Sequence, residues 1–379
     1  MHNSGSGGRS GGVCHVVAMP FPGRGHINPM MNLCKILASR RPNEILITFV
    51  VTEEWLGFIG ADPKPESIRL AAIPNVIPNE RHKAANFPAF YEAVMTNMEE
   101  PFDRLLDQLE PPPTVIIGCV ELRWPIALAN RRNIPVAAFW TMSAAFYSML
   151  HHLDVFAQQR HLNVDKDKLE LGENPSSVNN DHNHDYIQWL DSQPPESVLY
   201  ISLGSFLSVS GAQMNQIVEA LNSSNVCYLW VARADASWLK DKCGGKGMVV
   251  PWCDQLKVLS HSSVGGFWSH CGWNSTLEAL FTGVPMLTFP LFLDQVPNSS
   301  QIVDEWRNGC KVEAEKLDTE EVLAKEKIEK LVKRFMDLES QEGKQIRDRA
   351  REMKAVCHRA ISTVGSSHAN LDAFIRYIS

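Results

Sequence analysis

Three features are scarce or missing in this sequence of 379 residues, and each absence excludes a class of protein. The chain has no long basic block and a net charge of −7, so its charge pattern favours neither a nucleic acid nor a membrane surface as partner. The longest apolar run, 284–293, is too short to cross a bilayer and contains two prolines. The nine cysteines are scattered and form no Cys-x-x-Cys pair, which favours free thiols over a disulfide or zinc framework.

The start of the chain, residues 1–12, is rich in Gly and Ser and lacks the apolar core of a signal peptide. We expect this start to be disordered and the protein to be cytoplasmic, monomeric and without a membrane span. A chain of this length is too long for a single hydrophobic core, so two domains are predicted.

Apolar segments with strand character alternate with helical segments along the chain, which predicts an α/β fold with parallel sheets. Predicted strands lie at 13–19, 44–52, 115–117, 136–140, 197–204, 227–232, 248–250 and 264–268. Predicted helices lie at 30–41, 124–132, 210–221, 325–359 and 370–378. Asn28 is expected to be the N-cap of the first helix, with Pro29 at its first position. Ser210 and Gln213 are expected to form a capping box.

The segment 171–185 has no apolar periodicity and many turn-forming residues, so we interpret it as a linker. This interpretation gives an N-terminal domain at 13–170 and a C-terminal domain at 186–360. His182 and His184 lie in this segment, and we attribute them to a solvated linker rather than to a metal site.

The run 252–295 combines a predicted strand, a turn at 269–272 and a helix opening near Asn274. The free amides and the positive dipole end of a helix bind phosphate oxygens. His270 adds a donor beside this turn, and Asn274 and Ser275 can cap the helix and reach the same anion.

The same run supplies groups suited to the rest of a nucleotide sugar. Trp252 offers a flat face for a base. Glu278, Asp294 and Gln295 provide the oxygen acceptors and the amide that ribose and sugar hydroxyls require. The alternative is a buried βαβ unit in which these residues serve only as core and capping residues.

The loop after the first predicted strand carries His26 within the sequence PFPGRGHINPMMNL. Ligands of parallel sheets bind beyond the carboxyl ends of the strands, and His is well suited to accept a proton near neutral pH. A purely structural His26, bonded to a backbone carbonyl, is the alternative. A nicotinamide-dependent oxidoreductase is a further class: Glu53 closes the second strand, but Asn28 stands where a third glycine is needed.

The run 252–295, together with PFPGRGHINPMMNL, resembles the plant family 1 UDP-sugar-dependent glycosyltransferases that modify small molecules. The resemblance implies a GT-B fold of two facing Rossmann-like domains, with a C-terminal helix in 361–379 packing back on the N-terminal domain. It also implies transfer of glucose from UDP-glucose, as co-substrate, to a hydroxyl of a small, largely apolar acceptor of the secondary-metabolite or hormone type. The mechanism would be inverting and would use no metal and no further cofactor.

By the same resemblance, His26 is the general base that removes a proton from the acceptor hydroxyl. Trp252 and the backbone of Cys253 would hold uracil, and Gln255 and Glu278 would hold the ribose. The diphosphate would be held by His270, Asn274 and Ser275 and, less specifically, by Ser205. The transferred sugar would be held by Trp273, Asp294 and Gln295.

The sequence departs from the family pattern in two places. Relatives have an aspartate just after the strand at 115–117, where it orients the histidine, whereas Cys119 stands there in this chain. Glu121 lies on the same strand face but roughly 7 Å further along, which makes it a distant substitute. In addition, several tens of residues before the linker are missing, so the N-terminal domain is expected to be incomplete. A catalytically impaired UDP-sugar-binding relative is therefore the alternative function.

Overall fold

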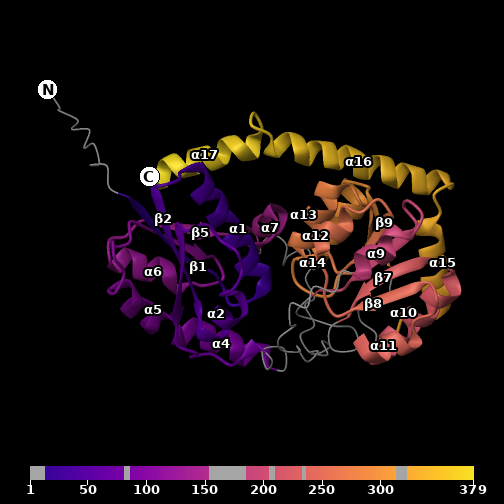
Figure 1. Cartoon of the computed structure of the whole chain (residues 1–379), viewed down its shortest axis with the longest axis horizontal. Coiled ribbons are helices and arrows are strands. Elements are labelled where there is room, and N and C mark those ends of the chain that lie inside the picture. Colours follow the sequence, from indigo (N-terminus) through magenta and orange to yellow (C-terminus); the bar gives the residue numbers. More distant parts are fainter. Residues whose placement is uncertain (1–12, 81–85, 153–184, 205–209, 233–235, 313–321) are drawn as a thin grey trace. The chain divides into compact units, whose positions relative to one another are not determined.

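The computed structural model describes residues 13–80, 86–152, 185–204, 210–232, 236–312 and 322–379. The expected disordered start, the predicted linker except Asp185, and Ser205 with both linker histidines lie outside these residues. The described chain forms two compact units (Figure 1). Unit 1 holds the residues up to Asn79 together with Asn86–Thr141 and Ala369–Ser379, and unit 2 holds those within Met142–His368.

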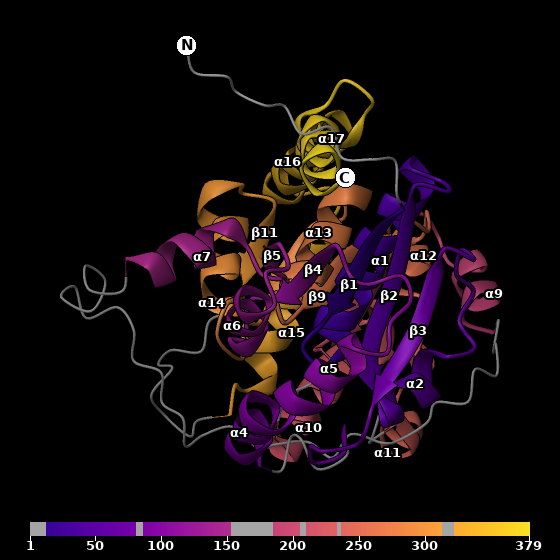
Figure 2. The same ribbon diagram turned by 90° about the vertical axis from the view of Figure 1, so that its left-hand side faces the viewer.

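Unit 1 is built on a parallel sheet of five strands in the order β3-β2-β1-β4-β5 (Figure 2). The strands are β1 (Cys14–Met19), β2 (Ile45–Thr52), β3 (Ile68–Ile73), β4 (Val115–Cys119) and β5 (Val136–Phe139). The helices are α1 (Arg24–Arg40), α2 (Glu53–Ile59), α4 (Phe87–Asn97), α5 (Glu99–Leu106), α6 (Trp124–Arg131) and α17 (Ser366–Ile378). Every residue of β1 is buried, as expected for a central parallel strand covered on both faces.

Helix α1 begins at Arg24, four residues before Asn28, so the prediction that Asn28 is its N-cap is wrong. The carbonyl of Gly23 accepts hydrogen bonds from the backbone N–H groups of both His26 and Ile27, which closes a first turn upstream of Asn28. Ile27 is buried in the core, so tertiary packing stabilises this turn. Asn28 is exposed and Pro29 lies inside the helix, and neither acts as a helix start.

Helix α17 packs on unit 1, although it is far from β1 in sequence. Ile375 and Ile378 are buried in the same core cluster as β1. The Cys14 thiol donates a hydrogen bond to the carbonyl of Ile378, and Arg40 forms an ion pair with Asp372. The last residues of the chain therefore complete the hydrophobic core of its first domain.

Unit 2 contains a six-stranded parallel sheet in the order β11-β10-β9-β6-β7-β8. The strands are β6 (Val198–Ser202), β7 (Cys227–Val231), β8 (Gly247–Val250), β9 (Val264–Ser269), β10 (Met286–Thr288) and β11 (Gly309–Lys311). The helices are α7 (Ala144–His151), α9 (Asp185–Asp191), α10 (Gly211–Ser224), α11 (Ala236–Lys242), α12 (Gln255–Leu259), α13 (Trp273–Thr282), α14 (Gln295–Ser300), the π-helix η1 (Gln301–Glu305), α15 (Lys325–Met336) and α16 (Gln341–Ile361).

Alternate residues of β6 enter two separate cores in unit 2. Leu199 and Ile201 pack into the cluster that contains residues of α10 and α15, whereas Val198 and Tyr200 pack into the cluster that contains residues of α12 and α13. This alternation follows from the two-residue period of a strand. Helices therefore cover both faces of this sheet (Figure 1).

The helix starts of unit 2 are only partly as predicted. Ser210 caps α10, since its hydroxyl accepts a hydrogen bond from the backbone N–H of Gln213 at 3.2 Å. The side chain of Gln213 instead bonds to both backbone groups of Leu323, so the reciprocal half of the capping box is not formed. The predicted helix 325–359 is two helices, α15 and α16. Within the described part of the chain, no helix combines the length and the apolar character needed to cross a membrane.

His15 is a buried histidine in the middle of β1. Its Nδ1 donates to the carbonyl of Pro111, and its Nε2 accepts from the hydroxyl of Thr48 at 2.8 Å. Burial lowers the pKa of His15 below its usual value of 6.5. The folded chain therefore holds the ring neutral at a pH where the unfolded chain already takes up a proton.

We predict that the free energy of unfolding decreases as the pH falls from about 7.5 to about 5.5, because protonation of the unfolded His15 pulls the equilibrium towards unfolding. The slope from this one group is at most ~1.4 kcal/mol per pH unit. Urea denaturation of the wild type and of His15→Gln at both pH values measures how the free energy of unfolding changes with pH in each protein. An equal pH dependence in the two proteins would contradict the prediction.

Candidate active site

Each sheet has one place where its connections reverse direction, and His26 and His270 follow strands that flank these two places. In unit 1, β1 leads to β2 on one side while β4 leads to β5 on the other. In unit 2, β6 leads to β7 on one side while β9 leads to β10 on the other. A crevice opens at the carboxyl ends of the two strands that flank such a switch point, and ligands of open α/β sheets bind there.

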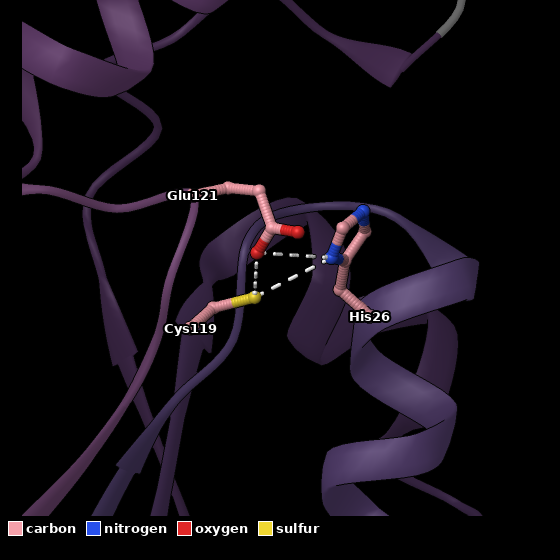
Figure 3. Close-up of side chains that lie close together, drawn as sticks. All are labelled: His26, Cys119 and Glu121. Carbon is pink, nitrogen blue, oxygen red and sulfur yellow. Dashed lines mark hydrogen bonds and ion pairs between the residues drawn. The ribbon is translucent and has the colours of Figure 1, made fainter. Parts of the chain in front are cut away.

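In unit 1, the loop after β1 and the end of β4 bring three reactive side chains together. His26 lies in the first turn of α1, Cys119 is the last residue of β4, and Glu121 follows in the adjoining turn (Figure 3). The Cys119 thiol donates a hydrogen bond to Glu121 Oε2 at 2.7 Å. His26 Nδ1 lies 3.4 Å from Cys119 Sγ and 3.7 Å from Glu121 Oε2.

The expectation that Glu121 lies roughly 7 Å further along the strand is wrong, whereas its role as a substitute for the aspartate stays a prediction. That expectation assumed that the strand continues, whereas β4 ends at Cys119 and the backbone N–H of Leu122 bonds to the carbonyl of Cys119 at 3.0 Å. This turn redirects Glu121, so its carboxylate approaches His26 instead of moving along the strand. A carboxylate therefore does lie beside the histidine, two positions after the expected one.

The electrostatics of this cluster place the negative charge on Glu121. Burial raises the pKa of the Glu121 carboxyl, and the hydrogen bond from Cys119 opposes that effect. Burial also raises the pKa of the Cys119 thiol, and the neighbouring Glu121 raises it further. Cys119 is therefore a neutral donor, and the carboxylate is the acceptor that faces the imidazole.

The Thr141 hydroxyl is a further partner of His26, with Oγ1 lying 2.9 Å from Nδ1. Thr141 is buried two residues after the end of β5, the strand that pairs with β4. No sequence pattern identifies this contact, because a single threonine after a strand is not distinctive.

One aromatic ring contacts the same histidine, and further rings pack against that ring. The ring of Phe21 lies 5.1 Å from the imidazole of His26, measured between centroids. Phe21 also contacts Phe90 and Tyr91 of α4, and Phe87 at the start of α4 contacts both of these rings. The base candidate of unit 1 therefore adjoins an apolar, largely aromatic wall.

In unit 2, the turn between β9 and α13 is formed as a tight reversal of the backbone. Cys271 adopts a left-handed conformation with φ of 66°, and Gly272 is the N-cap of α13 without a side-chain capping bond. The expectation that Asn274 and Ser275 cap the helix is wrong, because the helix already begins at Trp273 and both residues lie inside its first turn. The N-cap residue Gly272 therefore forms no side-chain bond to the first amides of α13.

His270 sits against two glycines that come from different strand ends. A Cβ atom on Gly272 would lie 2.5 Å from His270 Nε2, and one on Gly204, after β6, would lie 2.9 Å from it. Gly204 also has a φ of 98°, which other residues rarely adopt. The close packing of this imidazole therefore requires glycine on both sides.

A hydrogen-bonded network joins three of the predicted donor-binding residues. Gln255 Nε2 donates to Ser275 Oγ at 2.9 Å and to Glu278 Oε2 at 2.6 Å. The buried hydroxyl of Tyr200, in β6, donates to Gln255 Oε1 at 3.1 Å and lies 3.4 Å from Cys253 Sγ. Burial raises the pKa of Glu278, and the hydrogen bond from Gln255 opposes that effect.

Trp252 precedes this network and leaves 43% of its surface exposed, which is unusual for so large an apolar side chain. Cys253 beside it is buried, and burial raises the pKa of its thiol to about 12. The thiol is therefore neutral at physiological pH.

The remaining predicted residues lie around the start of α14. Asp294 Oδ2 accepts a hydrogen bond at 2.8 Å from Asn298, which also donates to the carbonyl of Cys271 at 3.0 Å. Gln295 Oε1 accepts from the backbone N–H groups of Leu291 and Phe292, which fixes its amide. Trp273 lies 6.5 Å from Trp306 between ring centroids.

Sequence reasoning missed Tyr200 and Asn298, both of which position predicted site residues. Tyr200 lies in a strand predicted from its apolar character, where a tyrosine is an ordinary core residue. Asn298 lies four residues after Asp294, and this spacing on a helix was the one signal that could have identified it.

These two units define a class of protein: two parallel α/β sheets with candidate site residues that follow the carboxyl ends of their strands. The sequence pattern of the family described as "UDP-glucoronosyl and UDP-glucosyl transferase" matches residues 114–337. The Arabidopsis thaliana UDP-glycosyltransferases 87A2 and 87A1 are 44% and 43% identical to the chain. The matches cover 96% and 95% of this chain and 97% and 99% of those proteins. The chain therefore belongs to the family 1 plant UDP-glycosyltransferases, which are hexosyltransferases that use a UDP-sugar.

Solved structures confirm the predicted GT-B class of fold. Os79 from O. sativa, in complex with UDP, matches with a TM-score of 0.80 at 24% identity, over 96% of this chain and 100% of that one. A UDP-glucose:anthocyanidin 3-O-glucosyltransferase in complex with UDP matches with a TM-score of 0.81 at 23% identity, over 97% and 99%. At this identity the likeness concerns the fold.

The alignment with 87A2 runs over 442 positions, more than the 379 residues of this chain. That relative therefore carries residues that have no counterpart here.

We predict that Gly272→Ala weakens the affinity for UDP by about tenfold or more, or ~1.4 kcal/mol, because the added methyl group displaces His270 from the start of α13. Isothermal titration calorimetry with UDP measures the effect. Gly245→Ala is the matched control, since a Cβ atom there has no neighbour within 4 Å. Unchanged binding by Gly272→Ala would show that the His270 packing is irrelevant to the nucleotide.

Proposed function

We propose that the chain transfers glucose from UDP-glucose to a hydroxyl group of a small, largely apolar acceptor with inversion, and that His26 is the general base. The single observation that carries this proposal is the approach of the Glu121 carboxylate to His26 Nδ1, at 3.7 Å. This contact supplies the acid that Cys119 fails to supply.

His26 acts through the nitrogen that Glu121 does not face. Glu121 Oε2 and Thr141 Oγ1 both lie beside Nδ1, so the neutral ring carries its proton there and presents an unprotonated Nε2. Nε2 takes the proton of the acceptor hydroxyl, and the hydroxyl oxygen forms a bond to the anomeric carbon of glucose. The bond from that carbon to the UDP oxygen breaks, and UDP leaves. Glu121 stabilises the imidazolium, as the carboxylate does in a Ser-His-Asp triad.

Donor binding belongs to unit 2 in this proposal. The first amides of α13 and His270 stabilise the charge of the diphosphate, with Asn274, Ser275 and Ser205 as further contacts. Trp252 stacks on uracil, the Cys253 backbone bonds to it, and Gln255 with Glu278 holds the ribose. Trp273, Asp294 and Gln295 face the glucose. The Tyr200 network supports these roles because it fixes Gln255 and Glu278 before the donor arrives.

Acceptor binding belongs to unit 1, and the aromatic neighbours of His26 support an acceptor with an apolar body. Phe21, Phe87 and Tyr91 offer ring faces to such a molecule, and one acceptor hydroxyl would then be directed at Nε2. The proposal includes no metal.

A second candidate function is UDP-sugar binding with little or no transfer. The Cys119 thiol donates to Glu121 Oε2, the same oxygen that lies nearest His26, and this bond withdraws negative charge from the imidazole. An N-terminal domain that lacks part of its length would act in the same direction. Assays with UDP-glucose and a panel of phenolic and aliphatic alcohols separate the two, since the second function gives UDP binding without glucoside.

We predict that Glu121→Gln lowers kcat by a factor of about 10² to 10⁴, because the amide cannot stabilise the imidazolium. Cys119→Asp in the Glu121→Gln background should restore part of the loss by returning a carboxylate to the strand end. Glu66→Gln, an exposed residue of unit 1, is the control. Initial-rate measurements under saturating UDP-glucose provide the test, and an unchanged kcat in Glu121→Gln would refute the role of this residue.

We predict that Trp252→Ala weakens UDP binding by about 1–3 kcal/mol, the range for stacking of one base on an aromatic ring. Trp252→Phe keeps a ring face and should retain most of the affinity. Calorimetry with UDP and with UDP-glucose compares the three proteins. Equal affinities would remove Trp252 from the donor site.

A further inference from the structure

We propose that His26, Cys119 and Glu121 form a zinc site, and that Zn²⁺ bound there blocks the base of the transferase. The inhibitory part of this proposal rests on the proposed function of His26, whereas the metal site itself does not. An imidazole nitrogen, a thiol sulfur and a carboxylate oxygen are the three kinds of ligand that Zn²⁺ takes in proteins. All three ligand atoms lie within 4.8 Å of one another.

Two of the three distances between the ligand atoms are close to those of tetrahedral coordination. With Zn–S of about 2.3 Å and Zn–N or Zn–O of about 2.0–2.1 Å, a tetrahedral ion separates sulfur from nitrogen or oxygen by ~3.5 Å, and nitrogen from oxygen by ~3.4 Å. The observed separations are 3.4 Å from Sγ to Nδ1 and 3.7 Å from Nδ1 to Oε2. Only the 2.7 Å contact from Sγ to Oε2 is too short.

That short contact is the hydrogen bond of the thiol, and metal binding removes it. The S–H bond breaks, its proton passes to the buffer, and the thiolate forms a bond to Zn²⁺. Sulfur and oxygen then separate to the two sides of the ion. One thiolate and one carboxylate neutralise the two positive charges, which favours the complex in this half-buried place.

The site is reachable and has spare ligand capacity. His26 and Glu121 retain 24% and 17% of their side-chain exposure, so an ion can enter from solvent. Glu121 Oε1 is buried and has no hydrogen-bond partner among the described residues, which leaves a second carboxylate oxygen for the ion. Three protein ligands leave the fourth position to water, as in open zinc sites.

Zinc on Nδ1 disables His26 by changing its tautomer. A neutral imidazole that binds a metal through Nδ1 carries its proton on Nε2. Nε2 is the atom that would accept the acceptor proton, so the zinc-bound enzyme has no base. Compared with the metal-free site, His26 loses the proton on Nδ1 and gains one on Nε2, so its charge does not change. The net result is the release of one proton, that of the Cys119 thiol.

The metal site is tested with Co²⁺, which reports a thiolate ligand through a charge-transfer absorption band. Titration of the full chain with Co²⁺, in the absence of nucleotide, should produce the band at one equivalent, and Zn²⁺ should abolish it. Cys119→Ser should lose the band, whereas Cys357→Ser, at a partly exposed cysteine of α16 in unit 2, should keep it. A wild type without the band, or a Cys119→Ser protein that retains it, overturns the proposal.

Glu121→Gln provides a second variant in case Cys119→Ser does not fold, as judged by circular dichroism. It retains the thiol, so the band should persist, but Co²⁺ affinity should fall by at least roughly tenfold, since even residues outside the coordination shell cost that much when replaced. Unchanged affinity would contradict Glu121 as a ligand.

Inhibition is tested separately by transfer assays. Zn²⁺ should abolish glucoside formation by the wild type, and a chelator should restore it. Mg²⁺ at the same concentration should not inhibit, because it prefers oxygen ligands. If transfer is absent but the Cys119-dependent band forms, the proposed function fails and the metal site stands. If transfer occurs and Zn²⁺ binds without inhibition, the blocking of His26 is refuted.

Discussion

The candidate site residues of this protein lie beyond the ends of the strands because its two sheets are parallel and covered on both faces. Every residue of β1 and of β9 is buried, so the body of each sheet offers no place for a polar reaction. Polar groups can gather only where the strands end, and the reversal of connections opens a crevice at those ends. A histidine follows the central strand in each unit: His26 after β1 and His270 after β9.

The two sites are constructed differently, and the difference matches the step proposed for each: binding of the diphosphate in unit 2 and proton transfer in unit 1. In unit 2 the backbone provides the site: Cys271 is left-handed, Gly204 and Gly272 leave room for an imidazole, and the first amides of α13 lie beside it. Fixed amides suit an anion whose charge grows as it leaves. In unit 1 side chains provide the candidate site, and the proton transfer proposed there requires groups that titrate.

In the Cys119–Glu121 pair, the carboxylate comes from a residue two positions after Cys119 and still lies beside His26. A buried carboxylate is costly unless hydrogen bonds stabilise it, and the Cys119 thiol supplies one of them. That thiol stabilises Glu121 but also competes with the imidazole for its charge. The same pairing places sulfur, oxygen and nitrogen within 4.8 Å of one another, so the proposed activity and the proposed metal site depend on the same three side chains.

The sequence by itself determined the family and the alternation of strands and helices in parallel sheets, because these depend on local patterns of apolar spacing and on a long, specific motif. Tertiary structure decided where side chains meet. The turn after β4 brought Glu121 to His26, the burial of Ile27 moved the start of α1, and a core tyrosine in β6 came to hold Gln255. Such contacts join residues far apart in the chain or depend on a turn of a few residues. Their free energy comes from packing that no local pattern records.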